Sequence, residues 1–141
     1  MTDPTDPHTR LARALSAVTE RIDTSVDASW DGLTGVQILI LRRLAGTERM
    51  DRASLALDTR TARAATVPSL SSLMQKGFVV ESQDAAGSYL RLTEGGRDLL
   101  TQVHIARAEW LVHAAEHAHP PVRGDDLLRM AALLEHLGSG D

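Results

Sequence analysis

The feature that most constrains the fold is a single change of periodicity at Gly77. Before this residue, apolar side chains recur at helical spacing, first at Leu11, Leu15, Val18 and Ile22. After it, two β-prone runs, 78–82 and 89–93, flank a stretch rich in turn residues at 83–88. The order predicts a series of helices followed by a β-hairpin.

Capping residues predict where the early helices begin and end. The first helix should run from about 8 to 27. Thr34 and Gln37 have the spacing of a capping box and precede a second, strongly apolar helix that Gly46 ends. Asp51 should cap a short helix over 52–57.

Later signals mark three more helices. One ends at Lys76, because Gly77 occupies the position after the helix and an apolar Phe78 follows it. Thr93 should cap a long helix from residue 94, which the prolines at 120 and 121 stop. A last amphipathic helix is expected over 125–137.

This order, α-α-α-α-β-β-α-α, is typical of a mainly α winged helix-turn-helix protein. We expect one winged-helix domain over 1–141, with a DNA-binding lobe at about 33–97. The helices at about 8–27 and 98–137 are more apolar on one side than a chain of 141 residues can cover alone. They therefore predict a homodimer joined through its N- and C-terminal dimerisation helices.

Composition excludes several classes of function. The chain has no cysteine, so disulfides and thiolate metal sites are ruled out. Its apolar runs are far shorter than the ~20 residues that cross a bilayer, and a cytoplasmic protein with no membrane partner is expected. Net charge is −4, yet residues 49–97 carry seven basic and five acidic groups. This positive middle third fits a nucleic-acid face, although chance scatter explains so small a difference equally well.

Four short motifs carry a resemblance to a known family: Leu33-Thr34-x-x-Gln37, Leu55-Ala56, Gly77-Phe-Val and Leu92-Thr-Glu-Gly-Gly-Arg97. Together they resemble the MarR family of bacterial transcription regulators, over about 11–137. The resemblance implies a homodimeric repressor that binds double-stranded DNA at a palindromic operator. It also implies release by a small aromatic or phenolic effector.

The sequence departs from that family in two places. Family wings carry an Asp-x-Arg element, whereas this chain has Asp84-Ala85-Ala86 and no basic residue between Lys76 and Arg91. Pro68 falls within the expected recognition helix, where it deletes a hydrogen bond to Ala64. Either the helix kinks there, which we favour, or it restarts with Thr66 as its cap.

Candidate DNA contacts follow from the helix-turn-helix reading. The start of the recognition helix should reach base edges, and flanking polar groups should bind phosphate. The base-edge candidates are Arg60, Thr61, Arg63 and Thr66. The backbone candidates are Arg52, Ser69, Ser72, Gln75 and Arg91.

Other candidate sites carry weaker signals. An effector could use Trp30, His104, Arg107 and Trp110, although Trp110 lies on an apolar stripe and fits a core position better. His113 and His117 share a helix face and could hold a metal with Glu109 or Glu116, but a polar helix face is the commoner meaning of such a pair.

No nucleophile or paired-carboxylate arrangement points to an enzyme, and no cofactor is expected. The alternative function is a winged-helix dimer that has lost DNA binding and acts through protein partners.

Overall fold

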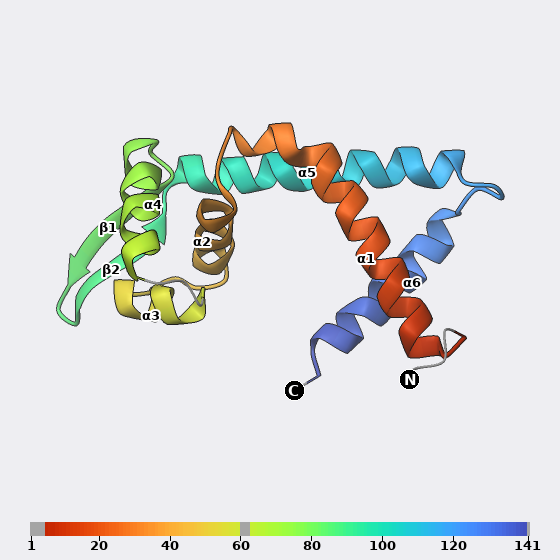
Figure 1. The fold of residues 1–141 in the computed structure, drawn as a ribbon, viewed down its shortest axis with the longest axis horizontal. Helices are drawn as coiled ribbons and strands as arrows, with labels where there is room; N and C mark the ends of the chain where they lie inside the picture. The colour runs from red at the N-terminus through yellow and green to blue at the C-terminus, as the bar shows by residue number, and fades with distance from the viewer. Residues whose placement is uncertain (1–4, 60–62, 141) are drawn as a thin grey trace.

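The computed structural model describes residues 5–59 and 63–140 and places them in two parts joined by a long helix (Figure 1). We call residues 33–59 and 63–97 the winged lobe, and they form one part. The other consists of the outer helices, namely α1, α6 and α5 beyond residue 97. The elements in chain order are α1 (Pro7–Val26), the 3-10 helix η1 (Asp27–Trp30), α2 (Gly35–Ala45), α3 (Arg52–Asp58), α4 (Arg63–Gln75), β1 (Val79–Asp84), β2 (Gly87–Leu92), α5 (Glu94–His117) and α6 (Gly124–Gly138).

The predicted caps begin the helices of the lobe. The Gln37 backbone N–H donates to the Thr34 hydroxyl at 3.3 Å, and the Gln37 side chain accepts from the Thr34 N–H at 2.9 Å, which completes the capping box. The Asp51 carboxylate accepts from the Ser54 N–H at 2.7 Å at the start of α3. These polar residues were therefore correct signals for the helix starts.

Gly77 ends α4 as the sequence predicts. Its φ of +81° lies in the left-handed region, which glycine adopts without a steric penalty. The Gly77 N–H donates to the Met74 carbonyl at 3.1 Å, and the Phe78 N–H donates to the Leu73 carbonyl at 3.0 Å. This paired pattern is a Schellman motif, and it turns the chain from α4 into the hairpin.

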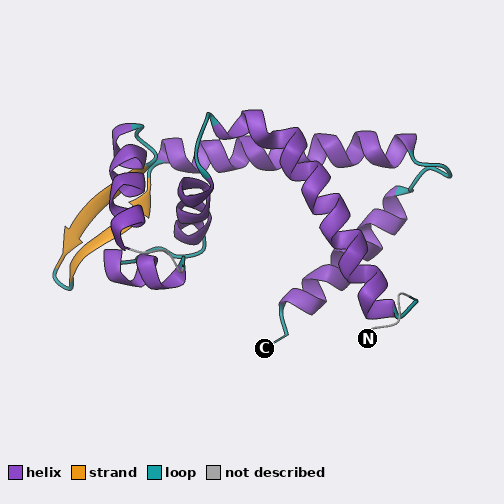
Figure 2. Ribbon diagram, viewed as in Figure 1, coloured by secondary structure: helices purple, strands orange, loops and turns teal. Residues whose placement is uncertain are grey.

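The hairpin is longer than the sequence predicts (Figure 2). β1 and β2 pair in antiparallel register from Val79–Leu92 to Asp84–Gly87, so the turn is two residues rather than six. The Asp84 carboxylate accepts from the Ala86 N–H at 2.9 Å, and Gly87 has a φ of +120°. These two local features tighten the turn and let the strands pair almost to its tip.

Most of the core lies in the winged lobe with α2 at its centre, and Val26, Trp30 and Val103 join it from outside the lobe. Ile40, Leu41 and Leu44 of α2 are buried, and they pack with buried residues of every other lobe element and of α5. The remaining fully buried side chains of the lobe are Leu55, Leu70, Leu73, Val79 and Leu90. The strong apolar character of α2 in the sequence is explained by this central place.

α4 runs through Pro68 without interruption. The alternative of a helix that restarts with Thr66 as its cap is therefore wrong, since Thr66 lies inside α4. The buried Leu70 and Leu73 anchor the following turns in the core, which offsets the hydrogen bond that Pro68 cannot make to Ala64.

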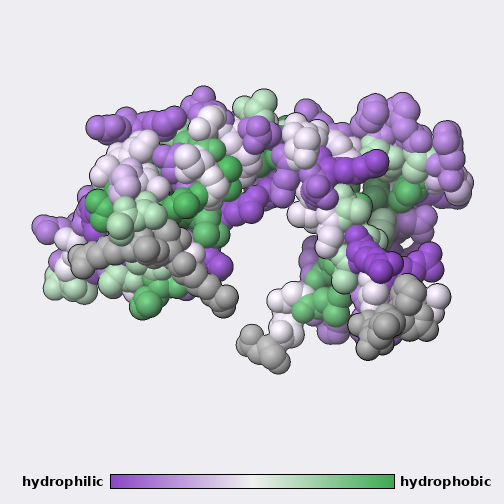
Figure 3. Space-filling view, in the orientation of Figure 1, coloured by the Kyte–Doolittle hydropathy of each residue, from purple (hydrophilic) through white to green (hydrophobic). Residues whose placement is uncertain are grey.

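The outer helices extend away from the lobe. α5 reaches across the molecule and contacts α1 along part of its length (Figure 1). Figure 3 shows an open space beneath α5, between the lobe and the outer helices, with patches of hydrophobic surface on both parts. Among the helices of residues 5–59 and 63–140, none combines the length and the apolar character that a membrane span needs.

Candidate nucleic-acid interface

Three elements converge on one edge of the winged lobe. α3, the start of α4 and the tip of the β1–β2 hairpin all lie toward the lower edge of the lobe in Figure 1. This is the arrangement in which a helix-turn-helix presents its second helix to the major groove and its wing beside it. We call this edge the lower face of the lobe.

The start of α4 lies partly outside the described residues. Arg60 and Thr61 fall in the undescribed segment, and Arg63 is the first residue of α4. Thr66 is 3% exposed, so in this conformation its side chain does not reach the surface that a groove would meet. The prediction that Thr66 contacts a base edge is therefore wrong.

The rest of α4 presents a neutral surface. Residues 64–75 contain no charged side chain. Ser69 and Ser72 are half-buried, and Gln75 is exposed at the end of the helix. The other exposed side chains of residues 64–75 are small or apolar, and they include Val67 and Pro68. Charge for phosphate binding must therefore come from residues beside α4.

Arg52 is one such residue, and it already has a partner. Its Nε and Nη2 donate to the same carboxylate oxygen of Glu81, at 3.2 and 2.7 Å. The pair joins the start of α3 to β1 on the exposed surface. Arg52 remains near the lower face, but a phosphate that binds its guanidinium there has to compete with the Glu81 carboxylate.

A second arginine lies at the tip of the hairpin, and the sequence analysis did not select it. Arg49 precedes α3, donates to the Asp84 carboxylate and stacks over the Tyr89 ring, with 4.5 Å between Cζ and the ring centroid. The hydrogen bond from Arg49 lowers the pKa of Asp84 below its ordinary value, and Asp84 in turn raises the pKa of Arg49. No local pattern signals this contact, because the two residues are 35 positions apart.

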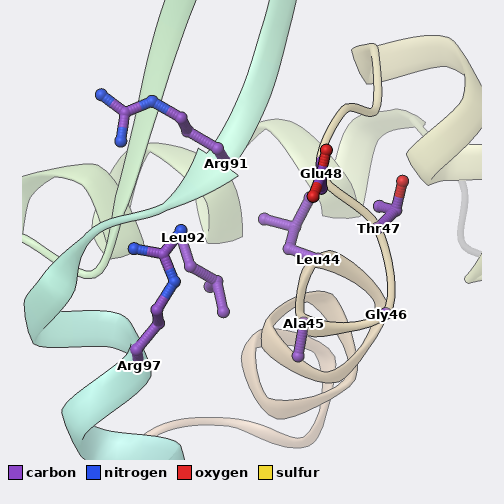
Figure 4. Close-up of a pocket in the computed structure, with 8 residues that line it drawn as sticks. All are labelled: Leu44, Ala45, Gly46, Thr47, Glu48, Arg91, Leu92 and Arg97. Carbon is purple, nitrogen blue, oxygen red and sulfur yellow. The ribbon is translucent and has the colours of Figure 1, made fainter.

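Arg91 lies farther from the tip. Its Nε donates to the Ser82 hydroxyl at 3.1 Å on the exposed face of the hairpin. Arg91 and Arg97 also line a shallow cavity of about 510 Å³, with Glu48 and the end of α2 on its other side (Figure 4). The cavity combines both signs of charge, and Leu92 and Leu44 form its apolar part.

The four effector candidates do not meet in one site. Trp30 is 5% exposed and belongs to the hydrophobic core, with the Arg42 guanidinium 5.5 Å from its ring centroid. Because η1 turns the Trp30 ring inward, Trp30 is a core residue and not an effector contact in this conformation. His104 is exposed on α5.

The other two candidates lie where α1 meets α5. Arg107 pairs with Asp23 at 3.5 Å, and its Nε is buried without a hydrogen-bond partner. Trp110 is half-buried and lines an open cavity of about 580 Å³ whose other residues, from α1, are Ala17, Glu20, Arg21, Thr24 and Ser25. Of the four candidates, Trp110 alone is among the residues that line this cavity.

The histidine pair stacks. The rings of His113 and His117 lie 4.0 Å apart, and His117 Nδ1 donates to the His113 carbonyl at 2.8 Å. The described residues contain no group of three or more His, Cys, Asp or Glu side chains that could hold a metal ion. Glu109 and Glu116 therefore do not complete a metal site with the pair.

Comparison by sequence finds nothing: no family model matches the chain, and no curated protein matches it either. Comparison by structure finds several solved proteins of the same fold. One is the transcriptional regulator Tm0710 from Thermotoga maritima, with a TM-score of 0.72 and 15% identity over 94% of this chain and 92% of that protein. Another is a MarR family protein from Bacillus stearothermophilus, with a TM-score of 0.70 and 18% identity over 92% and 89% of the two chains.

A third solved structure concerns a ligand as well. BpsR from Bordetella bronchiseptica, whose DNA binding is regulated by 6-hydroxynicotinic acid, matches with a TM-score of 0.60 and 16% identity over 100% of this chain and 99% of that one. These likenesses establish a mainly helical MarR-like winged-helix fold. Of these three neighbours, one is described as a transcriptional regulator, one as a MarR family protein, and the third as a protein whose DNA binding is regulated.

Proposed function

We propose that this chain is a DNA-binding transcription regulator that acts as a homodimer on a palindromic operator in the cytoplasm. The observation that carries the proposal is the lower face of the lobe. There α3, the start of α4 and the hairpin tip lie along one edge, and the nearby Arg49 and Arg52 pair with Asp84 and Glu81 of the hairpin. We assign base contacts in the major groove to the start of α4 and phosphate contacts to the two arginines. Winged-helix proteins use the same two kinds of contact.

The outer helices support the homodimer. Leu11, Leu15 and Val18 of α1 are exposed, as are Leu128, Leu133 and Leu137 of α6. Each fully buried Leu side chain contributes about 1.5–3 kcal/mol relative to an exposed one, so a second copy that covers these faces would gain considerable stability. Packing across a two-fold axis also places two lobes on the two half-sites of a palindrome.

We further propose repression that is relieved by a small aromatic or phenolic acid. The cavity between α1 and α5 offers the Trp110 ring for stacking and the Arg21 guanidinium for a carboxylate. The ligand that regulates BpsR, 6-hydroxynicotinic acid, belongs to this chemical class. An effector that binds between α1 and α5 could shift the spacing of the two lobes.

A second candidate function is a dimer that works through protein partners. It is favoured by the neutral surface of α4 over residues 64–75 and by the engagement of Arg52 with Glu81. Such a protein would show the same dimer, and it would bind a specific and a scrambled duplex with equally low affinity.

The test is selection of genomic DNA fragments by the purified protein, followed by salt-titrated binding on the selected and scrambled duplexes. We expect clear preference for the selected duplex. Arg63→Ala should cost about 1–3 kcal/mol on that duplex and relax the preference at one base step in each half-site. Arg123→Gln, which removes one cation at the start of α6, serves as the matched control. Equal, weak binding to both duplexes would favour the second candidate.

A further inference from the structure

A guanidinium from outside the hairpin is fixed at the wing tip. Arg49 lies between α2 and α3, and its Nη1 donates to the Asp84 carboxylate while its Nη2 donates to the Gly87 carbonyl at 3.4 Å. The neighbouring backbone is fixed as well, because the Leu90 N–H donates to the Met50 carbonyl at 2.7 Å. The Tyr89 ring supports the guanidinium from one side. Arg49 therefore moves with the hairpin although it does not belong to it.

We propose that Arg49 is the wing cation of this protein, and that it binds a backbone phosphate where the hairpin tip meets the duplex. The inference rests on the proposed DNA-binding function and names a residue for it. The hairpin has no basic residue between Lys76 and Arg91, so its own sequence describes a wing with no positive charge near the tip. The fold supplies that charge from a segment 35 residues earlier.

The Arg49 guanidinium has N–H groups that its contacts within the lobe do not use. It carries five N–H groups, of which the contacts to Asp84 and Gly87 use one on each terminal nitrogen. The Arg49 side chain is 39% exposed, so the remaining N–H groups can reach an incoming phosphate. A phosphate accepts two parallel bonds from such a fork, which makes arginine better suited than lysine to this position.

Asp84 acts as the positioning residue for Arg49. Its carboxylate holds Arg49 against the tip, and the Asp84–Ala86 hydrogen bond fixes the carboxylate in the turn. The pair is neutral overall, so the tip attracts DNA weakly at long range. The contribution of the tip to DNA affinity therefore depends on the position of the Arg49 guanidinium and not on the net charge of the pair.

The experiment separates placement from net charge with four variants of the full-length protein. Arg49→Gln removes the cation, and Arg49→Lys keeps the charge without the fork. The double variant Arg49→Gln with Asp84→Asn has the net charge of the wild type but lacks the guanidinium. Arg123→Gln removes a cation far from the lobe and serves as the control. Each is titrated with salt on the selected duplex and footprinted with hydroxyl radicals.

The expected result is a weaker salt dependence in the two variants that carry Gln at position 49. Each phosphate contact contributes about 0.9 to the slope of log affinity against log salt, so a dimer should lose about 1.8. The protected backbone beside the wings should become exposed, while protection in the central major grooves persists. Arg49→Lys should keep most of the slope, and Arg123→Gln should keep all of it.

Two results would overturn the inference. If the double variant binds with the wild-type slope and footprint, net charge and not placement is what matters. If Arg49→Gln weakens binding without changing the slope, Arg49 supports the hairpin but does not contact phosphate. If the wild type prefers no duplex at all, the proposed function itself fails, and this outcome is distinct from the other two.

Discussion

The winged lobe and the outer helices bury their apolar side chains to very different degrees. In the lobe, Ile40, Leu41 and Leu55 are fully buried, whereas on α6 Leu128 is 72% and Leu137 64% exposed. None of the residues of α6, all of which the structure describes, is buried. The lobe therefore completes its core within one chain, whereas the outer helices leave apolar faces that a second copy covers in the proposed homodimer.

This difference separates two kinds of stability. The lobe should be held by its own packing and caps, and its stability should not depend on protein concentration. The outer helices should gain theirs from a second copy, so their order should depend on concentration. Substitutions in the two regions should have different consequences, and the following predictions use that contrast.

The largest effect is expected on α6. Leu134→Glu with Leu137→Glu places two charges on one helix face, because positions three apart are neighbours on a helix. We expect loss of the dimer at micromolar concentration, measured by sedimentation velocity. Leu57→Glu, on α3, is the control, because Leu57 is 80% exposed but lies in the lobe. A dimer that survives the α6 change would show that these leucines are not at its interface.

The next effect tests the packing within the lobe. A Cβ at Gly96 would lie 2.2 Å from the Phe78 carbonyl oxygen, too close for any side chain without a backbone shift. Gly96→Ala should destabilise the lobe by about 1–3 kcal/mol, as overpacking does. Gly138→Ala, where a Cβ meets nothing within 4 Å, is the control in urea unfolding. Unchanged stability in Gly96→Ala would mean that α5 is not packed so closely on the hairpin.

A smaller effect is expected at the start of α5. The Thr93 hydroxyl accepts from the Gly96 N–H at 3.1 Å and donates to the Gly77 carbonyl at 2.5 Å. Thr93→Ala should cost about 0.5–2 kcal/mol, the usual range for a lost helix cap. Thr101→Ala, at an exposed position inside α5, should cost nothing. Equal melting temperatures for the two variants would contradict this role of Thr93.

The smallest effect concerns pH. The hydrogen bond from Arg49 lowers the pKa of Asp84 from its ordinary 3.8. A lowered pKa means that the pair stabilises the folded hairpin above pH 3.8 and loses this effect as pH falls through the folded value. In carboxyl NMR titrations, Arg49→Gln should move the pKa of Asp84 back up toward 3.8. An unmoved pKa would show that Arg49 and Asp84 do not pair in solution.

Sequence patterns predicted the local structure well because its causes are local. Thr34 with Gln37, Asp51 and Thr93 begin helices through hydrogen bonds three residues away, and Gly77 ends one by its own φ. Such signals lie within one turn of the element that they define. They fixed the order of helices and strands, and with it the fold class.

Contacts between distant segments could not be predicted in this way. The Arg49–Asp84 pair joins two turns that approach each other only after the lobe has folded. Trp30 becomes a core residue because η1 turns it inward, and Thr66 lies on a buried side of α4. The expected base contacts therefore lose Thr66, the expected effector contacts lose Trp30, and Arg49 is added to the candidate nucleic-acid interface.

The most direct test of the account is the mass of the protein–DNA complex on a selected duplex, measured by light scattering after size exclusion. We predict two chains per duplex, two protected half-sites about one helical turn (~34–36 Å) apart, and no complex with the Leu134→Glu, Leu137→Glu variant at the same concentration. A wild-type protein that stays monomeric and leaves the duplex free would contradict the account.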